Sequence, residues 1–152
     1  MTGPMVITGL ETGADDDGFW NIENGGRVSI KLFSRALAAW LVLQGRDVSV
    51  AEARSAFNTT GFVIGQAASY RRSLDVRGDK LCFVLDRQKA KEAIDASMLA
   101  SVVQVISFAQ NDTVRLGQLS VLMMVSRELI EAAICEHPYM SVQGDEIIHD
   151  GE

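Results

Sequence analysis

The strongest constraint on the fold of this chain is an internal repeat with a period of 66 residues. The hexapeptide VRGDKL, from Val76 to Leu81, returns as VQGDEI from Val142 to Ile147. A sustained match at one offset indicates a structural unit that occurs twice. We therefore predict two units of one architecture, with common ancestry as a further hypothesis. The aligned apolar pairs are Val48/Val114, Val50/Leu116, Ala53/Leu119, Phe57/Met123, Val63/Leu129, Ile64/Ile130, Ala67/Ala133 and Leu74/Met140.

Each unit is predicted to contain three helices followed by a β-hairpin. In the first unit, apolar residues at helical spacing predict a helix over 31–45. Ser49 and Glu52 have the spacing of a capping box, which starts a short second helix, and the turn at 58–61 leads into a third. The remaining predicted elements are the end of that third helix near Arg72, strands 74–76 and 81–85 around a type II′ turn at Gly78, helices near 98–110, 115–123 and 127–136, and strands 139–142 and 146–149.

Two further segments complete the predicted fold. Residues 87–110 are predicted to form one long helix that joins the units, and residues 19–30 are predicted to form a hairpin. We therefore predict an α+β fold with an N-terminal acidic arm and hairpin over 1–30, a basic unit over 31–86, and a linker helix with an acidic unit over 87–152.

The order of three helices and a hairpin, with a tight turn before the third helix, resembles the winged helix-turn-helix superfamily. The resemblance covers 31–86 and 98–150 and rests on element order. It implies a tandem pair of winged helices, in which the third helix and the hairpin of a unit face double-stranded DNA. The alternative is a plain α+β domain with two helix–hairpin modules and no nucleic-acid role.

Charge is divided between the segments of the chain, whose net charge is −6. Residues 25–91 carry twelve bases and five acids, whereas residues 92–152 carry two bases and ten acids. Residues 1–24 carry five acids and no base, and we expect the tract at 12–18 to be a mobile loop. Such asymmetry points to nucleic-acid contact by one part of a chain, here the first unit.

The resemblance also implies which side chains of the first unit contact DNA. Val63, Ile64, Ala67 and Ala68 form the predicted inward stripe of the third helix. Amide, hydroxyl and aromatic groups on its other face can meet base edges or thymine methyls, and nearby cations can meet phosphates. The implied DNA-binding residues are Thr59, Thr60, Phe62, Gln66, Ser69, Arg71, Arg72, Arg77 and Lys80.

The second unit carries different charges at the matching positions. Gln143 and Glu146 replace the cations of the first hairpin, and Glu131 stands where the first unit has Gly65. Because acids on this face would repel phosphates, we expect the second unit to have a structural role, to form a homodimer with a second copy of the chain, or to bind a protein partner. The predicted partner interface is Glu128, Glu131, Ala132 and Cys135.

The sequence thus predicts a DNA-binding protein, interpreted as a transcriptional regulator. The alternative is a tandem winged-helix interaction module of a multi-subunit assembly without direct DNA contact. The basic segment 25–91 favours the first, but Lys and Arg clusters also occur as solvated surface. Phe62 could equally be buried beneath Trp40, so both interpretations stay open.

Other classes of function find little support, and no enzyme, cofactor or metal is expected. His137 and His149 are the only histidines, and with Cys135 they lack the paired spacing of a zinc site. Cys82 and Cys135 lie among apolar neighbours and are expected to be reduced core thiols. No apolar run reaches the ~20 residues of a membrane span, and the N-terminus lacks a signal-peptide pattern, so we expect a cytoplasmic protein.

Overall fold

The computed structural model of the chain describes residues 6–8, 19–21, 27–109, 114–138 and 140–149. Within these ranges it contains seven helices and three small antiparallel sheets, which confirms the predicted α+β class. In chain order the elements are β1 (Val6–Thr8), β2 (Phe19–Asn21), β3 (Arg27–Ser29), α1 (Ile30–Gln44), β4 (Val48–Ser49), α2 (Val50–Phe57), α3 (Gly61–Tyr70), β5 (Leu74–Arg77), β6 (Lys80–Phe83), α4 (Arg87–Glu92), α5 (Ala96–Ala109), α6 (Leu116–Met123), α7 (Arg127–Cys135), β7 (Met140–Gln143) and β8 (Glu146–His149).

The boundaries of these elements reproduce the offset of 66 residues. Helices α2 and α6 correspond end to end, and so do the hairpins β5–β6 and β7–β8. Each second helix ends in a non-glycine residue with left-handed backbone, Asn58 at φ 48° and Met124 at φ 58°. Each is also tied to its hairpin turn by one backbone bond, donated by the first residue of the helix over 2.7 Å in the first unit and 3.0 Å in the second. The repeat therefore extends to local geometry.

Local signals in the sequence account for the helices of the first unit. Helix α1 ends at Gly45, whose φ of 74° is the left-handed conformation that glycine adopts without strain. The capping box at the start of α2 is present, because Ser49 Oγ accepts from the Glu52 amide and Glu52 accepts from the Ser49 amide. In the hairpin, Gly78 has φ 64° and Asp79 is not left-handed, which fits the predicted type II′ turn.

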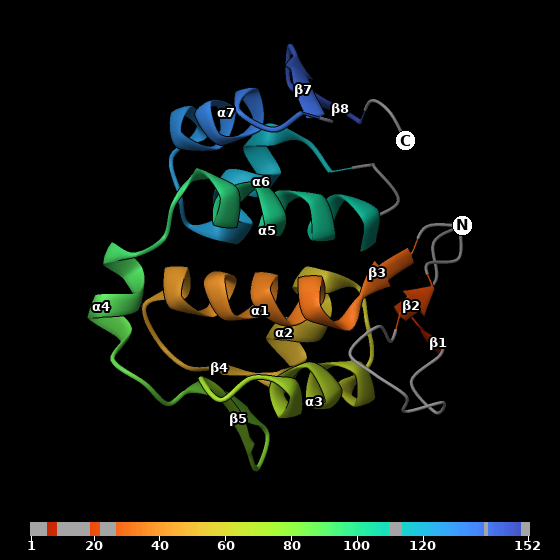
Figure 1. The fold of residues 1–152 in the computed structure, drawn as a ribbon, viewed down its shortest axis with the longest axis vertical. Helices are drawn as coiled ribbons and strands as arrows, with labels where there is room; N and C mark the ends of the chain where they lie inside the picture. The colour runs from red at the N-terminus through yellow and green to blue at the C-terminus, as the bar shows by residue number, and fades with distance from the viewer. Residues whose placement is uncertain (1–5, 9–18, 22–26, 110–113, 139, 150–152) are drawn as a thin grey trace.

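Helices α1 and α5 lie side by side and run in opposite directions, as Figure 1 shows, with α3 and α7 toward opposite ends of the molecule. Their facing sides share one hydrophobic core that draws on both units. Trp40 is nearly fully buried in it, its ring 5.5 Å from that of Phe57, and its Nε1 donates to the Leu122 carbonyl over 2.9 Å. Asn58 Nδ2, at the end of α2, likewise donates to the Ala109 carbonyl of α5 over 2.8 Å. The first unit is therefore hydrogen-bonded to the second from α1 to α6 and from the end of α2 to α5.

The prediction of one continuous helix over 87–110 is wrong, because the chain breaks between α4 and α5. Asp95 lies in the break, where its Oδ1 accepts from the Met98 amide over 2.9 Å and its carbonyl accepts from the Leu99 amide over 3.0 Å. A side chain that satisfies the free amides at a helix start favours a new helix over the continuation of the old one. The break lets α5 lie back along α1 (Figure 1).

The N-terminal part contains more strand than predicted. The hairpin expected over 19–30 is present as the pair β2–β3, with β1 added beside β2. Ile30 does not extend the strand but begins α1, because the side chain of Ser29 caps that helix. The residues that join the two strands of this hairpin and the acidic tract at 12–18 lie outside the described residues.

Candidate nucleic-acid interface

The inner face of α3 is as the sequence predicts. Val63, Ile64, Ala67 and Ala68 are all buried. The helix starts at Thr60, whose Oγ1 accepts from the Val63 amide over 3.3 Å. This bond fixes the hydroxyl at the helix start, so Thr60 contributes to the site as a cap.

The outer face of α3 carries the side chains of mixed chemistry. Phe62 is 67% exposed, so the alternative that places it beneath Trp40 is wrong. Gln66 is partly exposed and Ser69 is exposed on the same side of the helix. An exposed aromatic ring beside an amide and a hydroxyl offers an apolar contact and hydrogen-bonding groups to one ligand surface.

Thr59 does not belong to this outer face, contrary to the prediction. It is 6% exposed, and its Oγ1 has no hydrogen-bond partner among the described residues. Asn58, which precedes Thr59 and has left-handed backbone, turns the chain so that the side chain of Thr59 is buried. At the matching position the second unit has the apolar residue Val125, which is partly buried.

Gly65, the counterpart of Glu131, was not among the predicted DNA-binding residues. It lies in the middle of α3, where glycine is less favourable than alanine by about 1 kcal/mol. A Cβ at this position would meet no heavy atom of the described residues within 4 Å, so the interior of the protein does not require glycine here. Because packing within the protein does not explain this glycine, we interpret it as allowing close approach of a ligand to the helix backbone.

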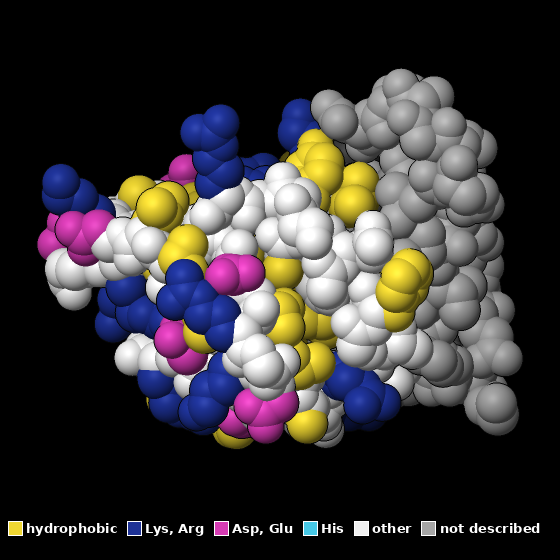
Figure 2. All heavy atoms as spheres, turned by 90° about the horizontal axis from the view of Figure 1, so that it is seen from below, with side chains coloured by type: hydrophobic (Ala, Val, Ile, Leu, Met, Phe, Trp, Pro, Cys, Tyr) yellow, Lys and Arg dark blue, Asp and Glu magenta, His cyan; other side chains and the backbone are white. Residues whose placement is uncertain are grey.

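The predicted phosphate-binding cations fall into two kinds. Arg72 and Lys80 are exposed and make no ion pair with any described residue. Arg77 donates from Nε to Asp75 over 2.9 Å, and this hydrogen bond raises the pKa of Arg77. Figure 2 shows this end of the molecule, with Lys and Arg side chains spread over it and exposed apolar groups between them.

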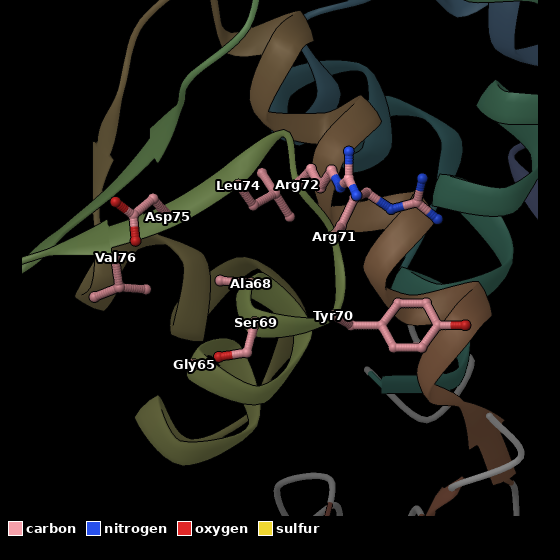
Figure 3. Close-up of a pocket in the computed structure, with 9 residues that line it drawn as sticks. All are labelled: Gly65, Ala68, Ser69, Tyr70, Arg71, Arg72, Leu74, Asp75 and Val76. Atoms are coloured by element: carbon pink, nitrogen blue, oxygen red, sulfur yellow. The ribbon is translucent and has the colours of Figure 1, made fainter. Parts of the chain in front are cut away.

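Arg71 is only partly exposed, because it lies against α1. Its Nε donates to Ser34 Oγ over 3.1 Å. An open groove of about 650 Å³ runs from here along the end of α3 to β5. Figure 3 shows Arg71 and Arg72 on the α1 side of this groove and Ser69 and Asp75 on the other side.

The matching face of the second unit is occupied by ion pairs of its own. Arg115 contacts Glu146 over 3.3 Å, and Arg127 contacts Asp145 over 2.9 Å and Glu131 over 3.3 Å. These two arginines are the only bases after residue 91. The acidic hairpin is therefore held to α6 and α7 by internal pairs that the first unit lacks.

The predicted partner interface lies on the surface of α7. Glu128, Ala132 and Cys135 are exposed, while Glu131 is partly buried. The expectation of two core thiols is half wrong, because Cys135 is exposed on α7 and only Cys82 is buried. Burial raises the pKa of the Cys82 thiol. Both cysteines are free rather than disulfide-bonded.

An apolar surface lies around the turn between α6 and α7, of which the sequence pointed to Met124 but not to Val121 or Leu129. Val121 is 77% exposed, Met124 61% and Leu129 56%, and they are three of the five exposed large apolar residues of the described chain. Leu129 aligns with the buried Val63, so the repeat predicted a core position for it. Burial depends on what covers a helix, which the period of the sequence does not report.

The described residues contain no group of three or more His, Cys, Asp or Glu side chains that could hold a metal ion. In the same ranges, no helix has the length and apolar character needed to cross a membrane. No protein-family model, curated protein or solved structure matches the chain.

Proposed function

We propose that this chain is a tandem winged-helix protein that binds double-stranded DNA as a transcriptional regulator. The binding surface would be α3 and the β5–β6 hairpin of the first unit. Support comes from the element order, in which each unit presents three helices and then a hairpin. In the first unit, β4 also joins the hairpin in the sheet order β4-β6-β5.

The observation that carries the proposal is the contrast between two faces of equal geometry. The first unit presents Arg72 and Lys80 without ion pairs to described residues, beside an open helix backbone at Gly65. The second unit has Glu131 and Glu146 on the same positions as Gly65 and Lys80, both bound to arginine. Because the fold does not require the cations, their presence in one unit needs another reason, and phosphate binding supplies it.

The burial and hydrogen bonds of the predicted DNA-binding residues reduce the number that we propose to contact DNA. Gln66, Phe62 and Ser69 would face the major groove, where an amide can pair with adenine and an apolar ring can contact a thymine methyl. Arg72 and Lys80 would bind phosphates on either side. Three predicted residues are left out because they have internal roles, namely the buried Thr59, the cap Thr60, and Arg77, which is paired with Asp75. Arg71, whose Nε donates to Ser34, is not assigned to this set of contacts.

A salt titration of duplex binding tests this proposal. The double variant Arg72→Gln and Lys80→Gln should weaken binding to any duplex and reduce the slope of log K against log salt by about 2, since each phosphate contact contributes about 0.9. The matched control is Lys89→Gln with Lys91→Gln on the exposed face of α4, which removes the same charge. Equal losses from both variants would show general electrostatics and would contradict a binding face on α3.

A second role is favoured by the apolar surface of Val121, Met124 and Leu129, flanked by the exposed acid Glu128. We infer that the second unit binds a protein with apolar and basic side chains, or a second copy of the chain. Because α3 and α7 lie toward opposite ends (Figure 1), both surfaces could be occupied together. Light scattering at several protein and salt concentrations tests self-association, and Met124→Ser should abolish a dimer that persists in high salt. A monomer under every condition leaves a different protein as the partner.

A further inference from the structure

Three arginines gather where α1 meets the end of α3, and none of them forms an ion pair with a described residue. Arg35 lies on α1, and Arg71 and Arg72 follow α3 directly. Of the other arginines of the first unit, Arg46 and Arg77 each contact a carboxylate at 2.9 Å, whereas the exposed Arg54 stands apart without an ion pair to a described residue. The cluster is therefore a concentration of positive charge without an internal counter-charge.

The guanidinium of Arg71 is held in place by a buried hydroxyl. Ser34 is fully buried, donates to the Ala67 carbonyl over 3.1 Å and accepts from Arg71 Nε over 3.1 Å. This chain of bonds connects α1, α3 and the arginine. It uses only Nε, which leaves the terminal nitrogens of Arg71 for a ligand.

Arg35 stands close enough for its charge to act on Arg71. Burial lowers the pKa of Arg71, the Tyr70 phenol opposes this effect, and the charge of Arg35 lowers the pKa further. Arg35 is itself fixed by a bond from its terminal nitrogen to Ser97 Oγ over 3.2 Å. Two like charges held together repel each other, and a bound anion would remove that cost.

The groove beside the cluster has room for such an anion. Its volume is about 650 Å³, and Tyr70, Arg71 and Arg72 line it (Figure 3). The one carboxylate in its lining, Asp75, is already bound to Arg77. The accessible charge in the groove is therefore positive.

The second unit shows that the fold does not need these groups. Ala100, Ser101, His137 and Pro138 stand where the first unit has Ser34, Arg35, Arg71 and Arg72. The cavity that His137 and Pro138 line is only about 150 Å³, lies partly against the start of α5, and has Glu136 in its lining. Every cation of the cluster is absent from the copy, so the cluster has a role beyond holding the helices together.

We propose that Arg71 and Arg72 bind a phosphate group in this groove, and that the neighbouring charge of Arg35 strengthens the binding. Guanidinium groups match the geometry of phosphate oxygens and bind them with two parallel hydrogen bonds, which explains the use of arginine at the two positions that line the groove. The phosphate belongs either to a small molecule, such as a nucleotide, or to a duplex backbone. The site does not depend on the proposed DNA-binding function, because a small phosphate ligand would fill it equally.

Titration with inorganic pyrophosphate at constant ionic strength, followed by NMR of the arginine Nε–H resonances, tests the site. The wild-type chain should show saturable shifts of Arg71. The double variant Arg35→Gln and Arg72→Gln should bind about tenfold more weakly or worse, because it loses the charged hydrogen bonds of Arg72 and the nearby charge of Arg35. Arg71 is not substituted in this variant, because its bond to Ser34 supports the contact between α1 and α3.

The control variant Arg46→Gln with Arg54→Gln removes the same charge from exposed positions of the first unit that do not line the groove. It should bind pyrophosphate like the wild type. Absence of saturable binding by the wild type, or equal losses from the two double variants, would overturn the site.

The source of the phosphate follows from the same titration in the presence of saturating duplex. If the duplex blocks pyrophosphate, the site takes a backbone phosphate. If both bind together, it takes a small phosphate ligand. A wild type that binds pyrophosphate but no duplex would sink the proposed DNA-binding function and leave this site standing.

Discussion

Replacing Gly65 by alanine should make the protein more stable and a poorer DNA binder. The backbone at Gly65 is ordinary helix, and the added methyl group would meet no heavy atom of the described residues within 4 Å. The substitution therefore adds no clash and removes the conformational freedom that glycine has in the unfolded chain. The expected gain is about 0.5–1 kcal/mol in the free energy of unfolding.

Urea denaturation at equilibrium measures this gain directly. A chain of this size should also melt about 1–4 °C higher, because 1 kcal/mol corresponds to about 2–4 °C. Gly117→Ala on α6 is the matched control, since a Cβ there also meets no described heavy atom within 4 Å and the position lies in the second unit. It should stabilise the protein and leave duplex affinity unchanged.

Duplex affinity, measured by fluorescence anisotropy, separates the functional reason from the conformational one. A methyl group at position 65 should weaken binding several-fold by holding the duplex away from α3. Gly65→Glu, which copies Glu131 of the second unit, should weaken it much further because a carboxylate then faces phosphate. A Gly65→Ala variant that is less stable than the wild type would show that the methyl group does not have room at position 65. Unchanged duplex affinity in both variants would show that DNA does not contact this face.

Three other predictions follow from buried and capped groups. Thr59→Val should stabilise the protein by about 1 kcal/mol in urea denaturation, because it removes a buried hydroxyl that has no partner among the described residues; a loss of stability would show that the hydroxyl is bonded. Glu52→Gln should keep the cap but lose the ion pair with Arg46, which lowers the pKa of Glu52 from its ordinary 4.5. In urea denaturation the wild type should therefore be more stable than this variant above pH 4.5, and the difference in stability should vanish as pH falls through the lowered pKa. Iodoacetamide should label Cys135 but not Cys82 in the native protein, as mass spectrometry would show, and labelling of both would contradict the burial of Cys82.

Local signals explain why much of the fold could be predicted. The caps at Ser49 and Gly45 and the turn at Gly78 fix the ends of adjacent helices and strands through local contacts. The observed ends of these elements are therefore close to the predicted ones. The break at Asp95 was missed because the apolar residues on either side continue a helical spacing across it. A capping carboxylate outweighs that spacing only because α5 can then lie along α1.

The candidate site was less predictable because its geometry depends on contacts between distant residues. Arg71 bonds Ser34, which lies 37 positions earlier in the chain, and no local pattern connects them. The burial of Thr59 and the exposure of Leu129 depend equally on what packs over each helix. Periodicity separated the inner face of α3 from the outer one, but it could not tell which outer groups are already bonded.

The antiparallel contact of α1 with α5 has a consequence for stoichiometry. Two copies of one subunit, related by a two-fold axis, always present identical faces, because every substitution appears in both. Here the two halves belong to one polypeptide, so a substitution at Gly65 leaves its counterpart Glu131 untouched. Every molecule therefore carries one cation-rich end and one acid-rich end in a fixed ratio of one to one, at any protein concentration and without a step of subunit selection.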